Sequence, residues 1–172
     1  MLILRSSKKI YVFISAIFLI IFLAFAVVHA AEISNDDFDS LTAFTGLPYS
    51  SQQDISAAST ALDDPLIAAC GLGQASNSVW YSYTPSINSD ITIDTQGSDY
   101  DTVVAVWTGS RGSLSLVACN NDDPRGGTHS ALDISVSANT TYYIEVARAA
   151  PGGGNNLFLN VEYFFDKNET KV

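Results

Sequence analysis

Apolar and polar residues alternate along most of this chain, and this period of two constrains the fold more than any other feature. In residues 132–136 every second side chain is apolar, which is typical of a strand with one buried and one exposed face. Residues 103–107 are apolar throughout, as in a strand buried on both faces. Further alternating segments are residues 79–84, 91–94, 113–116, 142–146 and 157–163.

Turn-forming residues separate the alternating segments. Glycine, asparagine and aspartate gather at residues 96–98, 108–110, 120–127 and 151–156. Short strands with turns at intervals of about 8–12 residues predict an antiparallel sandwich. We therefore expect an all-β fold, a jelly-roll-like antiparallel β-sandwich over residues 31–165, followed by a polar tail at 166–172. The Ala-rich residues 56–69 have room for one helical turn.

The first thirty residues differ from the rest of the chain. Arg5, Lys8 and Lys9 precede an apolar stretch at residues 10–28, and the small residue Ala30 follows it. This order predicts a signal peptide over residues 1–30, formed by an N-terminal hydrophobic helix and cleaved after Ala30. The alternative is an uncleaved anchor that contacts the membrane through residues 10–28. Either way, we expect the domain that follows to be secreted or at the cell surface.

Acidic residues dominate the chain after residue 30. Five basic and 18 acidic residues remain there, a formal charge of −13. Phosphate backbones repel such a surface, so we expect no nucleic-acid partner. Gly71-Leu72-Gly73 lacks the third glycine of a dinucleotide fingerprint, and we expect no organic cofactor. His129 is the one histidine after residue 30 and has no nucleophile motif near it, so we expect no catalytic residues.

Two cysteines, Cys70 and Cys119, are the whole thiol content of the chain. An even number of cysteines in an oxidising compartment favours a disulfide between them. The alternative is two buried free thiols.

Aspartates and asparagines concentrate near two ends of predicted strands. Asp99 and Asp101 precede one strand, and Asn121, Asp122 and Asp123 follow the next. A hairpin would bring both groups together, and Ca²⁺ binds six to eight oxygens of these types. The pattern therefore predicts a calcium site from these five residues. The same pattern is typical of turns capped by Asp and Asn side chains, with charges that only interact with solvent. Both interpretations stay open.

Several motifs occur in a specific order between residues 35 and 163. They are Asn-Asp-Asp-Phe at 35–38, Cys-Gly at 70–71, Ser-Val-Trp-Tyr-Ser-Tyr-Thr-Pro at 78–85, Gly-Ser-Asp-Tyr-Asp-Thr-Val-Val-Ala-Val-Trp-Thr-Gly at 97–109, Val-Ala-Cys-Asn-Asn-Asp-Asp at 117–123 and Thr-Thr-Tyr-Tyr-Ile-Glu-Val at 140–146. The series resembles the bacterial pre-peptidase C-terminal domain, and residues 101–109 resemble CUB domains more distantly. The resemblance implies a non-catalytic jelly-roll-like sandwich of the kind attached to secreted hydrolases, with some relatives that bind calcium or an extracellular polymer.

These observations favour a secreted or cell-surface binding module that has no enzymatic activity. We expect calcium to stabilise this module. Its partner would be an extracellular polymer, a protein or a carbohydrate, and the sequence does not identify it. The alternative is a structural subunit of a cell-surface assembly, and a hydrolase is the third class. Exposed aromatic side chains would serve ligand binding, but we expect most of the aromatic residues in these strands to lie in the core. They are Trp80, Tyr81, Tyr83, Tyr100 and Trp107.

Overall fold

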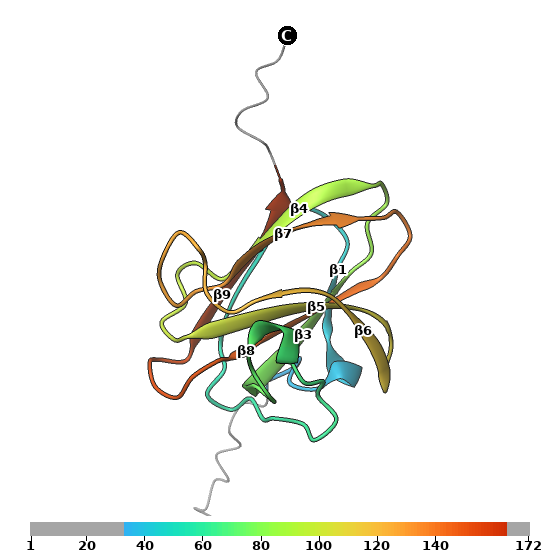
Figure 1. The fold of residues 1–172 in the computed structure, drawn as a ribbon. Helices are drawn as coiled ribbons and strands as arrows, with labels where there is room; N and C mark the ends of the chain where they lie inside the picture. Colours follow the sequence, from blue (N-terminus) through green and yellow to red (C-terminus); the bar gives the residue numbers. More distant parts are fainter. Residues whose placement is uncertain (1–32, 165–172) are drawn as a thin grey trace, which may run out of the picture. The chain divides into compact units, whose positions relative to one another are not determined.

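A computed structural model describes residues 33–164, which form two β-sheets packed face to face (Figure 1). The five-stranded sheet has the order β1-β3-β8-β5-β6, and the four-stranded sheet has the order β2-β9-β4-β7. The strands are β1 Thr42–Phe44, β2 Tyr49–Asp54, β3 Ser76–Tyr83, β4 Ser89–Asp94, β5 Thr102–Ser110, β6 Ser113–Asn120, β7 Ala131–Val136, β8 Tyr142–Arg148 and β9 Asn156–Tyr163. Two short 3₁₀ helices, η1 Phe38–Ser40 and η2 Ala68–Cys70, lie between strands.

The main core lies between the two sheets. Alternate residues of each strand point into it, because successive side chains of a strand face opposite sides. Phe44 stacks between Tyr49 and Tyr83 at ring-centroid distances of 4.0 and 5.1 Å. The buried strand residues of this core are Phe44, Val79, Tyr81, Tyr83, Ile91, Ile93, Val104, Val106, Ile134, Val136, Tyr142, Ile144, Val146, Leu157, Leu159 and Val161.

A second core covers the outer face of the five-stranded sheet. Strands β3, β5 and β8 are apolar on this face too, and the contributing residues are Trp80, Val103, Ala105, Trp107 and Ala147. Residues 55–75, the covering loop, connect β2 to β3 and supply Ile67 and Ala75 to this core. Phe38 of η1 packs edge-on against Trp80, with ring centroids 5.1 Å apart. The central strands of this sheet are therefore buried on both faces.

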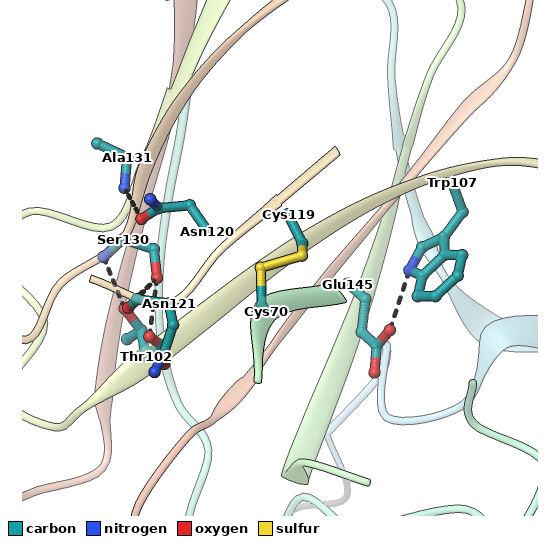
Figure 2. Close-up of a disulfide and its surroundings, with 9 residues drawn as sticks. All are labelled: Cys70, Thr102, Trp107, Cys119, Asn120, Asn121, Ser130, Ala131 and Glu145. Carbon is teal, nitrogen blue, oxygen red and sulfur yellow. Dashed lines mark hydrogen bonds between the residues drawn. A yellow bond between two sulfur atoms is a disulfide. The ribbon is translucent and has the colours of Figure 1, made fainter. Parts of the chain in front are cut away.

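The covering loop is fastened at several points. Cys70 and Cys119 form the predicted disulfide, with Cα atoms 6.1 Å apart (Figure 2). Arg111, in the turn between β5 and β6, makes ion pairs with Asp63 of the loop and with Asp37 and Asp39 of the segment before β1. Exposed ion pairs contribute little each, so the covalent bond is the strong fastening.

The all-β sandwich and the β5–β6 hairpin confirm the sequence predictions, and η2 supplies the one helical turn that the Ala-rich segment allowed. All pairings are antiparallel except that of β1 with β3, which is parallel. Strands β1 and β2 were not predicted. The predicted signal helix lies outside the described residues. None of the helices in residues 33–164 is long and apolar enough to cross a membrane.

Removing the disulfide tests how much it stabilises the fold. A bond that closes a loop of 49 residues restricts the unfolded chain by about 4 kcal/mol in the chain-entropy model. We expect the double variant Cys70→Ser, Cys119→Ser to lose about 3–4 kcal/mol of unfolding free energy, measured by urea denaturation of non-reduced protein. A loss below about 1 kcal/mol would show that the covering loop stays in place without its covalent fastening.

Candidate functional site

The candidate site lies where β5 begins and β6 ends. Asp101 directly precedes β5, and Asn121 and Asp122 directly follow β6. The two strands are antiparallel, with Val104 opposite Asn120. This register places the start of one strand beside the end of the other, as the hairpin argument predicted.

A network of buried hydroxyl groups supports this end of the sandwich. Thr95, Thr102 and Ser130 are fully buried, and the hydroxyls of Thr95 and Thr102 lie 2.6 Å apart. The Ser130 hydroxyl lies 2.8 Å from the backbone carbonyl of Thr102 and 2.9 Å from that of Asn121, so its single proton serves these two acceptors (Figure 2). Asn120 Oδ1 accepts from the backbone N–H of Ala131 at 2.9 Å. These bonds hold the ends of four strands in one arrangement and so fix the loops around Asp101.

Two acceptor oxygens in this region have no hydrogen-bond partner within the described residues. They are Asp101 Oδ1 and Asn121 Oδ1, and both atoms are buried. Burial raises the pKa of Asp101, and the negative charge of Asp122 raises it further. A buried acceptor without a donor costs about 1–3 kcal/mol. Unpartnered acceptor oxygens beside a second carboxylate repel one another, whereas a cation would bind them.

Asp99 has a structural role instead. Its carboxylate accepts hydrogen bonds from the backbone N–H and the side-chain amide of Asn156, each at 2.8 Å. Its backbone carbonyl accepts from the N–H of Gly154, also at 2.8 Å. Asp99 therefore shapes the glycine-rich loop before β9, and the structure does not bring its carboxylate into a group with Asp101.

Asp123 also pairs with residues outside this group. Its carboxylate accepts hydrogen bonds from the Arg125 guanidinium and backbone N–H at 2.8–2.9 Å. His129 Nε2 lies 3.2 Å from Asp123 Oδ2. The hydrogen bonds from Arg125 lower the pKa of Asp123 to about 2, so it stays ionised. Of the five predicted ligands, Asp99 and Asp123 pair with neighbouring residues, whereas Asp101, Asn121 and Asp122 lie next to the adjoining ends of β5 and β6.

Within residues 33–164, no three His, Cys, Asp or Glu side chains lie close enough together to hold a metal ion. The Asp101–Asp122 pair therefore reaches the number of oxygens that calcium needs only with the Asn121 amide, backbone carbonyls and water. This donor set is compatible with the weak sites of extracellular proteins. Sequence reasoning missed Thr95, Thr102 and Ser130, because hydroxyl residues at strand ends also occur as ordinary turn residues.

The outer face of the four-stranded sheet carries a second polar feature. A hollow of about 470 Å³ opens there, and its lining includes Tyr49, Asp94, Gln96, Asn160 and Glu162. Asn160 Nδ2 donates to Asp94 Oδ1 at 3.1 Å, which orients both side chains. The five aromatic residues singled out from the sequence do not line this hollow, because all of them are buried in the two cores.

Comparisons with known proteins find similarity among solved structures. No protein-family model matches the chain, and no curated protein matches it significantly. Among solved structures, it is similar to the pre-peptidase C-terminal domain of collagenase from Bacillus anthracis, with 13% sequence identity and a TM-score of 0.47. The match covers 78% of this chain and 99% of that one. This is the family that the sequence motifs resemble.

Gly154 provides a test of the role assigned to Asp99. A Cβ atom at Gly154 would collide with the Asp99 carboxylate, which two hydrogen bonds from Asn156 hold in place. We expect Gly154→Ala to lower the unfolding free energy by about 1–3 kcal/mol, a typical cost of overpacking, as measured by chemical denaturation.

Gly73→Ala is the matched control for this variant. A Cβ atom at Gly73 meets nothing within 4 Å, so its effect should stay within about 0.5 kcal/mol. Equal effects from the two variants would contradict the structural role of Asp99.

Proposed function

We propose that this chain is a non-catalytic binding module that works outside the cytoplasm and binds one calcium ion beside Asp101. The observation that carries the proposal is the pair of buried, unpartnered oxygens, Asp101 Oδ1 and Asn121 Oδ1, next to the charge of Asp122. A calcium ion there would satisfy both oxygens and neutralise the repulsion between the carboxylates.

The surrounding structure supports a preformed site. The hydroxyl network of Thr95, Thr102 and Ser130 fixes the backbone on both sides of Asp101 and Asn121. Ligands held in this way lose little conformational freedom when an ion binds. The formal charge of −13 after residue 30 also favours cation binding at this end of the molecule.

The arrangement of the titratable groups supports a non-catalytic role. His129 and Asp123, a pair that occurs in hydrolases, lie in contact with each other and with Arg125. The pKa of Asp123 is lowered to about 2, far from the neutral values that suit a general acid or base. Glu145 is buried beneath the covering loop, where a substrate has no access to it.

The disulfide supports a location outside the cytoplasm. Such bonds persist in oxidising compartments and are rare where thiols are kept reduced. The order of basic, apolar and small residues in the first thirty positions is that of an export signal.

The hollow on the four-stranded sheet is the surface we propose for a polymer partner. Asp94, Asn160 and Glu162 offer amide and carboxylate groups, which hydrogen-bond the hydroxyl and amide groups of polysaccharides and extended peptides. Binding of the purified full chain to an array of such polymers, with Asn160→Ala as the comparison, tests this surface.

Calcium titration tests the proposed ion site. With a dissociation constant in the range of about 10⁻⁴–10⁻³ M, 10 mM calcium should stabilise the folded state by about 1–3 kcal/mol. The melting temperature should then rise by several degrees, measured by calorimetry. Magnesium should stabilise less, because it requires tighter octahedral geometry.

Two variants complete this experiment. Asp101→Asn should remove most of the calcium effect, whereas Asp133→Asn, which changes an exposed aspartate on the other sheet, should keep it. Equal, small shifts from calcium and magnesium in the unmodified chain would overturn the calcium site and leave the solvating-turn interpretation.

A further inference from the structure

A buried carboxyl group lies in the centre of the outer face of the five-stranded sheet. Glu145 is on β8, opposite Trp80 of β3 and Ala105 of β5, and it is 1% exposed. The indole N–H of Trp107 donates to Glu145 Oε2 at 3.0 Å (Figure 2). A fully buried glutamate is rare unless a cation or several donors accompany it.

The covering loop places a second carboxyl group against this cluster. Asp64 is 9% exposed, and its Oδ2 accepts hydrogen bonds from the Ser78 hydroxyl at 2.5 Å and the Ala61 backbone N–H at 3.1 Å. Beneath the loop, the buried indole N–H of Trp80 has no hydrogen-bond partner within the described residues. The loop therefore closes over two acidic groups and both tryptophans of the chain.

The charges around Glu145 are all of one sign. Burial raises the pKa of Glu145 to about 8, and the charge of Asp64 adds to this shift. Burial also raises the pKa of Asp64, and the neighbouring Asp63 contributes. The guanidinium of Arg111, which contacts the covering loop, is paired with Asp63 and the exposed aspartates of the η1 segment. The remaining titratable group on this face is Tyr143, two residues before Glu145.

We propose that Glu145 and Asp64 form a proton-dependent latch for the covering loop. With Glu145 protonated, the loop lies closed against the sheet. When the proton is lost at higher pH, the closed loop leaves the charges of Glu145 and Asp64 in a poorly solvated space, and the loop moves away so that water reaches them.

The loop is the part that moves, because Glu145 itself is fixed. Strand β8 lies between β3 and β5 and pairs with both, so the backbone at Glu145 is held on two sides. The covering loop contains only the three-residue helix η2, and Leu62 and Leu66 are exposed on it. The Cys70–Cys119 bond keeps the opened loop attached to β6, so that closing remains a local and reversible event.

The pH dependence has a defined sign. In the unfolded or opened state Glu145 titrates near its ordinary pKa of 4.5, whereas in the closed state the pKa is about 8. Between these values the closed state binds more protons than the open state, so its stability falls as pH rises. The contribution of Glu145 to the stability of the closed loop is thus fully present below about pH 4.5 and is lost by about pH 8.

Tryptophan fluorescence of the full chain measures the opening directly. Both tryptophans, Trp80 and Trp107, are buried under the loop. We expect acrylamide quenching to increase about two-fold or more between pH 6 and pH 9.5, because the opened loop admits the quencher. Glu145→Gln, whose amide oxygen still accepts from Trp107, should stay closed and show no increase. Asp64→Asn removes the charge that adds to the raised pKa of Glu145, so its rise should be smaller or absent.

Asp133→Asn is the matched control, since it changes an exposed carboxylate on the other sheet and should behave as the unmodified chain does. A flat quenching profile in the unmodified chain, or the same rise in Glu145→Gln, would overturn the latch. If that variant does not fold, carboxyl ¹³C NMR of the unmodified chain decides, because the chain has four glutamates, Glu32, Glu145, Glu162 and Glu169. No signal titrating above about pH 6 would refute the proposal.

Discussion

The five-stranded sheet carries large apolar side chains on both faces, and the rest of the structure depends on covering the second one. The other sheet covers the inner face, as in any sandwich. The outer face carries Trp80, Val103, Ala105 and Trp107, whose burial contributes about 1.5–3 kcal/mol for each large side chain. The connection between β2 and β3 provides the cover, and the disulfide compensates for its lack of regular structure.

Buried polar groups stabilise the end of the sandwich where β5 begins and β6 ends, whereas apolar groups stabilise its centre. The buried hydroxyls of Thr95, Thr102 and Ser130 satisfy one another and several backbone groups. Such a network specifies one arrangement, because breaking any bond leaves a buried polar atom unpaired. Asp101 and Asn121 lie at its margin, where two oxygens remain unsatisfied. The network that rigidifies this end therefore also holds the two oxygens for which we propose a cation partner.

The sequence predicts strands well where apolar and polar residues alternate and less well where the inward residues are polar or the strand is short. Strand β2 was missed because its inward residues Ser51 and Gln53 are polar, and β1 because it has only three residues. The hairpin register places Asp101 and Asn121 at adjoining strand ends, as predicted, whereas ion binding by them stays a prediction. Asp99 and Asp123 do not join them, because their partners Asn156 and Arg125 depend on loop conformations that periodicity does not encode. Glu145 reads as a solvent-facing residue in its strand pattern, and only the covering loop makes it buried.

The disulfide also sets a mechanical limit on the domain. Fully extended, residues 33–164 would reach about 460 Å, at about 3.5 Å per residue. The bond between Cys70 and Cys119 removes the 49 residues it encloses from any path of tension between the two ends, which shortens that reach to about 290 Å. Strands β3, β4, β5 and nearly all of β6 lie inside the closed segment. A pull on both ends would therefore leave β3, β4 and the β5–β6 hairpin within a segment that the force does not stretch.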